Sequence, residues 1–219
     1  MLVCIPAVRA GPVRKVCETV YYPEEYSFMR CEDHYMLGCF LLEQSSVPIR
    51  PACRRMFLMG CVEPDINLLT FIRGTNKKRF LRGHCAQSSE KHLKKLLNKF
   101  TDAGVSTPMQ WFLLGTAMHY LEDSFVYVHN DYVRVRHSEH RNYEIRLHET
   151  LRVCLAKWKP GTGKSLPFAE GLEAWHEKYR SEAPSIRTDC QYVIAAAVLV
   201  YTQLRKDARR PMPGIPQLA

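Results

Sequence analysis

Histidines and carboxylates gather in one central stretch of this sequence, where five of the nine histidines lie between residues 119 and 148. His119 precedes Asp123 by four residues, and His140 precedes Glu144 by the same spacing. Because residues four apart on a helix project from one face, each pair can hold a metal ion. Zinc favours this mixture of imidazole nitrogen and carboxylate oxygen. His129 lies past the expected end of the first of these helices, where a turn could bring it toward the second pair.

A single pair of this kind is commonly a surface ion pair or a satisfied hydrogen bond in the core. Two pairs within 26 residues, with His129 between them, favour metal binding. His137 is an alternative to His140, since it lies three residues earlier. We prefer His140, because it alone of the two has a carboxylate four residues later.

The elements that position these residues are predicted to be helices. Apolar residues at helical spacing indicate helices over 32–44, 52–61, 88–100, 108–127, 138–158, 170–180 and 185–206. Thr107 and Pro108 are typical of a helix N-cap followed by proline in the first turn. Pro64 is expected to end the second helix, because proline disfavours helical geometry in the residue before it. No strand alternation appears, so the sequence predicts an all-α fold.

We expect a multi-helix single domain over residues 29–210, preceded by an irregular arm over 1–28 and followed by a loose tail over 211–219. A chain of 219 residues with 46% hydrophobic and 24% charged residues has ordinary globular composition and can bury a core. The nine cysteines form no CxxC pair, which argues against a thiolate zinc site. Several of them, such as Cys39, Cys154 and Cys190, lie in apolar helical patterns, a usage that indicates a reducing compartment.

The charge favours an anionic partner, because the formal net charge is +9. Nucleic acid, a phosphorylated metabolite and an acidic membrane surface all fit. Lys77, Lys78, Arg79 and Arg82 precede His84 and could attract phosphate or form a solvated loop. The longest apolar run, 192–201, is too short to span a bilayer, and basic residues interrupt the first 20 positions. We therefore expect no anchor and a cytoplasmic protein of bacterial type, with secretion as the alternative.

The stretch Leu114–Asp123, followed by His129, His140 and Glu144, resembles bacterial zinc-dependent phospholipase C, and more distantly the S1/P1 zinc nucleases. Three upstream residues extend the resemblance over about residues 30–150. Asp65 stands in a sequence like the Pro-Asp turn of the family, His84 is similar to the next ligand, and His34 is similar to the early histidine. The resemblance implies an all-helical fold of the phospholipase C / P1 nuclease type.

It also implies the metal ligands, which would hold two or three zinc ions. One ion would be held by Asp65, His84, His119 and Asp123, a second by His129, His140 and Glu144, and a third by His34 with Asp123 as the bridge. Secreted members complete the third site with a mature N-terminal tryptophan, whereas here 33 residues precede His34 and no tryptophan precedes Trp111. Choline-selective members have an aromatic residue after the ligand aspartate, where this chain has Ile66, so choline selectivity is not expected.

The activity that the resemblance implies is zinc-dependent hydrolysis of a phosphodiester, with a phospholipid as substrate and water activated by the metal. Asp65 is the candidate for orienting or deprotonating that water. Peripheral contact with a membrane would accompany a lipid substrate. The alternatives are a nuclease that acts on nucleic acid and a non-catalytic metal-binding protein with the same fold. A phosphohydrolase of the HD type is excluded, because no adjacent His-Asp pair occurs.

Overall fold

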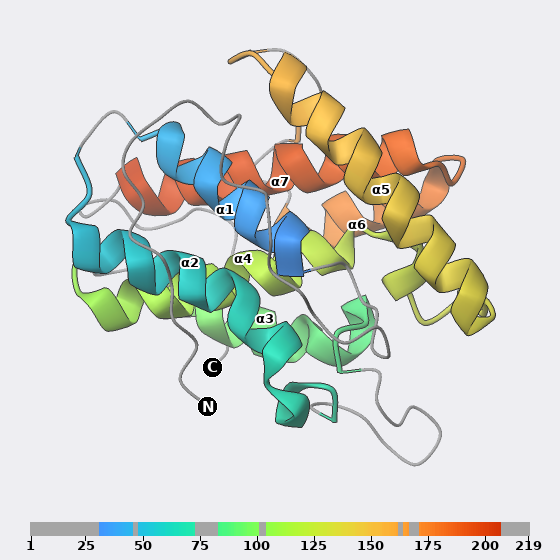
Figure 1. The fold of residues 1–219 in the computed structure, drawn as a ribbon, viewed down its shortest axis with the longest axis horizontal. Coiled ribbons are helices and arrows are strands. Elements are labelled where there is room, and N and C mark those ends of the chain that lie inside the picture. The colour runs from blue at the N-terminus through green and yellow to red at the C-terminus, as the bar shows by residue number, and fades with distance from the viewer. Residues whose placement is uncertain are drawn as a thin grey trace.

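The computed structural model describes residues 31–45, 48–72, 83–100, 104–161, 164–166 and 171–206. The expected arm (1–28) and tail (211–219) lie outside these residues, as does the basic segment 73–82. Every regular element in the described ranges is helical, which confirms the all-α prediction (Figure 1). The elements are α1 (Cys31–Glu43), α2 (Pro51–Ile66), η2 (Leu68–Thr70), α3 (Ala86–Asn98), α4 (Pro108–Ser124), η3 (Tyr127–His129), α5 (His137–Lys157), α6 (Gly171–Ser181) and α7 (Ile186–Lys206).

Helix α4 is the central element of the fold. Its start is fixed by a capping box, in which Thr107 Oγ1 accepts a hydrogen bond from the Gln110 backbone amide and Gln110 Oε1 accepts one from the Thr107 backbone amide. From Leu114 to Ser124 every residue is buried, because α1, α2, α3 and α7 pack around this part of the helix. A helix covered on all sides can carry polar residues only where they find partners inside the protein.

Helices α2 and α4 approach until their backbones touch. A Cβ atom added at Gly60 would lie 2.1 Å from the carbonyl oxygen of Phe112, and one added at Gly115 would lie 2.1 Å from that of Phe57. Only glycine fits at such a crossing. The contact fixes the distance between the C-terminal halves of the two helices.

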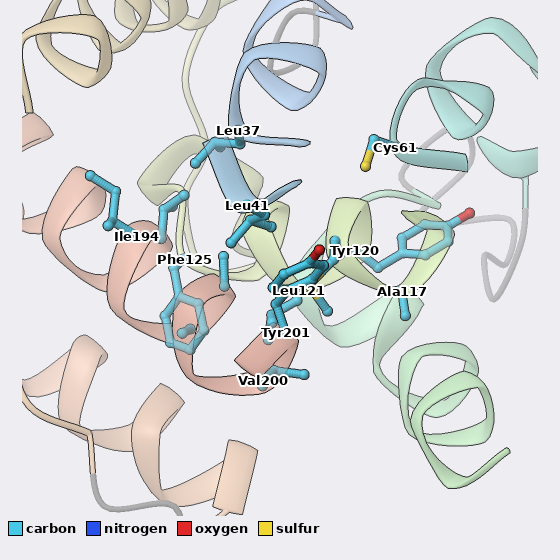
Figure 2. Packing of buried hydrophobic residues seen from close by; sticks show 14 of the residues in the cluster. Leu37, Leu41, Cys61, Ala117, Tyr120, Leu121, Phe125, Ile194, Val200 and Tyr201 are labelled. Carbon is cyan, nitrogen blue, oxygen red and sulfur yellow. The ribbon is translucent and has the colours of Figure 1, made fainter. Parts of the chain in front are cut away.

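The hydrophobic core surrounds α4 and takes side chains from α1, α2, α3 and α7. Figure 2 shows part of it, with Leu37 and Leu41 of α1, Leu121 of α4, Phe125 directly after that helix, and Tyr201 of α7. All five are fully or almost fully buried. Within the described residues, no helix is both long and apolar enough to cross a membrane.

The expected end of the second helix was wrong. Helix α2 does not stop at Cys61 but continues through Pro64 to Ile66. Proline removes one helix hydrogen bond, yet the packing of α2 on α4 outweighs this local cost, and the Pro64 carbonyl accepts a hydrogen bond from Thr70 Oγ1 at 2.5 Å. The extra turn carries Asp65 on a helix. The other helix ends differ from the prediction by three residues or fewer.

We predict that Gly60→Ala destabilises the protein by about 3 kcal/mol or more, since its Cβ would overlap a backbone atom that cannot move alone. Gly38→Ala is the matched control, because its Cβ would meet only the side chains of Cys61 and Leu58 at 3.0 Å. Urea unfolding followed by circular dichroism measures both. Equal free energies of unfolding for the two variants would contradict the backbone contact.

Candidate metal centre

Separate elements bring the eight candidate ligands into one region. They are His34 in the first turn of α1, Asp65 at the end of α2, His84 just before α3, His119 and Asp123 of α4, His129 of η3, and His140 and Glu144 at the start of α5. His140 is partly exposed, and the side chains of the other seven are buried or nearly so. Short contacts through Asp123 and His129 join them into one cluster.

Four of these side chains form a compact group with the dimensions of a zinc site. His84 Nδ1 and His119 Nε2 are 3.1 Å apart, and each lies 3.3 Å from Asp123 Oδ2. Asp65 Oδ1 lies 3.5 Å from the His84 nitrogen and 3.6 Å from the His119 nitrogen. Ligand atoms about 2.0–2.1 Å from a tetrahedral zinc ion are about 3.3–3.4 Å from one another. Asp65, His84 and His119 can therefore share one ion, and Asp123 Oδ2 lies at a similar distance from both of these histidines.

Asp123 stands between this group and the other histidines. Its Oδ2 faces His84 and His119, whereas its Oδ1 lies 2.9 Å from His129 Nδ1 and 3.4 Å from His34 Nε2. Neither oxygen makes a contact of hydrogen-bond geometry with the residues that the structure describes. A carboxylate whose two oxygens face separate sets of nitrogen atoms has the arrangement of a bridging ligand.

A second group consists of His129, His140 and Glu144. Glu144 Oε1 lies 3.4 Å from His129 Nε2 and 3.0 Å from His140 Nε2. These three residues can share an ion. His137 is exposed at the first turn of α5, so the structure brings His140 and not His137 to Glu144.

His34 forms a third group with His119 and Asp123. His34 is the one member that the first group does not already contain. Beside it, the buried Asp33 accepts a hydrogen bond from His148 of α5 at 2.5 Å, which ties the first turn of α1 to α5. His148 has this structural contact and lies outside the three groups.

Three of the imidazoles are oriented by hydrogen bonds to the ring nitrogen that does not face Asp123. His119 Nδ1 donates to the carbonyl oxygen of Cys61 at 2.8 Å, and His34 Nδ1 donates to Glu122 Oε2 at 2.6 Å. Each ring then presents its Nε2 lone pair to Asp123. Such partners fix the tautomer of metal-binding histidines.

Thr70 fixes the tautomer of His84 in the same way. The Thr70 hydroxyl donates its single proton to the Pro64 carbonyl. Its contact with His84 Nε2 at 2.9 Å must therefore be one in which the imidazole N–H donates and the hydroxyl accepts. His84 Nδ1 is left with a lone pair that faces His119 and Asp123. Three supporting groups were not predicted from the sequence: Thr70, Glu122 and the Cys61 carbonyl. Glu122 could have been predicted to be functional, since it is a carboxylate inside an otherwise apolar helical stretch. No sequence pattern marks the other two.

Burial shapes the electrostatics of the centre. It lowers the pKa of His34 to about 3 and that of His84 to about 4, so both imidazoles are neutral and their lone pairs are available. Burial raises the pKa of Asp65 to about 7. It would also raise the pKa of Asp123, but His129 and His119 outweigh it and hold that pKa well below its usual range.

The ion-pair partners that the structure describes for Asp65, Glu122 and Asp123 are all histidines. Buried carboxylates need compensating positive charge, and a divalent cation among these donors supplies it.

The comparisons with known proteins identify a zinc-dependent family. The family model described as zinc dependent phospholipase C matches residues 46–186, a range that contains every candidate ligand except His34. No curated protein and no solved structure matches the chain. Since the family match covers well over half of the sequence, the chain belongs to the zinc-dependent phospholipase C family.

Proposed function

We propose that this protein is a zinc-dependent phosphodiester hydrolase that cleaves the head group from a phospholipid. The observation that carries the proposal is the convergence of His34, His84 and His119, with their tautomers fixed from behind, on the two oxygens of Asp123. Family membership supports the reaction class. The substrate class follows from the family and is part of the proposal.

In this proposal the first group would hold one zinc ion, His129, His140 and Glu144 would hold a second, and Asp123 would link them to His34. Zinc, when bound, polarises a phosphoryl oxygen and makes a nucleophile available at neutral pH. The ligands keep the ions close enough to act on one phosphate, since Asp123 contacts histidines of every group.

Asp65 is the proposed general base. Its Oδ1 faces His84 and His119, which leaves Oδ2 as the oxygen that is not turned toward these imidazoles. An oxygen in that position can accept the proton of the attacking water while the other oxygen binds the metal. Thr70 and Phe71 hold His84 in place, because the Phe71 ring stacks on the imidazole at 4.4 Å.

Ile66 bears on which lipid head group is preferred, because it is exposed directly after Asp65. An aliphatic side chain has no π face for a quaternary ammonium group. We therefore propose that this residue confers no preference for choline over ethanolamine.

We predict that His140→Ala binds about one zinc ion per chain fewer than the wild type, because it removes a ligand from a group of three. His137→Ala is the matched control, since His137 is an exposed histidine three residues away. Elemental analysis of the dialysed proteins gives the zinc content. Equal zinc content in His140→Ala and the wild type would contradict the second site.

We predict that Asp65→Asn lowers hydrolysis of phosphatidylethanolamine by about 100-fold or more, since the amide cannot accept the proton. Release of the phosphorylated head group is the readout. Glu139→Gln, at an exposed carboxylate of α5, should match the wild type.

Single-stranded DNA is the comparison substrate. Cleavage of DNA without cleavage of lipid by the wild type would favour the nuclease alternative. Activity on neither substrate with zinc bound would favour a non-catalytic metal-binding protein.

A further inference from the structure

Four aliphatic side chains are exposed directly after Asp65. Ile66 is 57% exposed, Leu68 69%, Leu69 71% and Ile72 44%. Scattered exposed apolar residues are ordinary, whereas a contiguous group of them marks an interaction site. Figure 1 shows η2, which carries the two leucines, projecting beyond the end of α2 at the lower edge of the molecule. We call residues 66–72 the apolar turn.

The apolar turn is firmly held on its inner side. Asn67 caps η2 by accepting a hydrogen bond from the Leu69 amide at 3.2 Å. Thr70 is fully buried and contacts His84, and Phe71 is buried and stacks on the same imidazole. The inner residues therefore tie the turn to a metal ligand, while the leucines between them face outward.

Positive charge lies beside the apolar turn. Exposed lysines follow one another at four-residue spacing along α3, at Lys91, Lys95 and Lys99. Lys95 and Lys99 line a hollow together with Glu63, whose carboxylate accepts a hydrogen bond from Asn67 at 2.6 Å.

We propose that the apolar turn inserts into the surface of an anionic phospholipid bilayer, with the α3 lysines against its head groups. Aliphatic side chains beside lysines are the combination that binds the interface of such a membrane. The inference rests on the proposed function, because docking here places lipid phosphodiesters next to Asp65. A second copy of the chain fits less well, since the lysines of two copies would repel each other. Nucleic acid fits less well too, since aliphatic side chains provide no face for stacking bases.

The test compares the zinc-loaded wild type with the double variant Leu68→Ser, Leu69→Ser. Each protein is sedimented with vesicles of phosphatidylcholine containing a minor fraction of phosphatidylserine. We expect the bound fraction of the double variant to fall about tenfold, because two apolar side chains no longer leave water. Hydrolysis of water-soluble bis(p-nitrophenyl) phosphate should stay within about twofold of the wild type, since the metal ligands are untouched.

The matched control is Met109→Ser, Val153→Ser, which removes two side chains that are 59% and 51% exposed at the start of α4 and near the end of α5. Vesicle binding of this control should equal that of the wild type. Undiminished binding of the leucine variant, or an equal loss in the control, would overturn the proposal. So would a wild type that is dimeric without vesicles and becomes monomeric in the leucine variant.

Leu69→Trp keeps the turn apolar and provides a second test of membrane insertion if the serine variant fails to fold. Its tryptophan emission should shift to the blue when the anionic vesicles are added, and no shift would overturn the proposal. Binding is read independently of catalysis. If neither vesicle lipid nor the soluble diester is hydrolysed while the leucine variant still loses binding, the proposed function fails and the docking surface stands.

Discussion

The carboxylates of Asp65 and Asp123, held inside the protein beside buried imidazoles, are the constraint on which the rest of the structure depends. Such groups are costly to bury without compensating charge. They lie where they do because α4 carries Asp123 into the interior on a helix that is covered on every side, and because α2 brings Asp65 against it. A divalent cation would offset this cost, since the donors are already gathered in groups of three whose ligand atoms lie close together.

Around that centre the fold supplies positioning rather than chemistry. The backbone contact at Gly60 and Gly115 sets the spacing of α2 and α4. Side-chain and main-chain acceptors behind His34, His84 and His119 then set the orientation of the rings. Ligands and supporting groups come from the same elements, so a shift of one helix would disturb both at once.

Much of this could be predicted from the sequence. The four-residue spacing in α4 and α5 is a local pattern that helix geometry converts directly into paired ligands, and the all-α fold follows from apolar periodicity. Asp65, His84 and His34 came from the family resemblance, because their convergence depends on contacts between distant segments. The extension of α2 past Pro64 could not be foreseen, since tertiary packing on α4 overrides a local rule. Thr70 was missed for a similar reason: its role exists only once η2 folds beneath His84.

The touching backbones of α2 and α4 have a consequence for how the protein acquires its metal. Asp65, His119, Asp123 and the Cys61 carbonyl all belong to this one helix pair, so their relative placement is a property of the apoprotein. The entropy of assembling these donors is lost during folding, before any ion arrives. A metal ion would then bind at the first group to donors that folding has already placed. Small zinc modules differ, because their chains fold only when the ion binds.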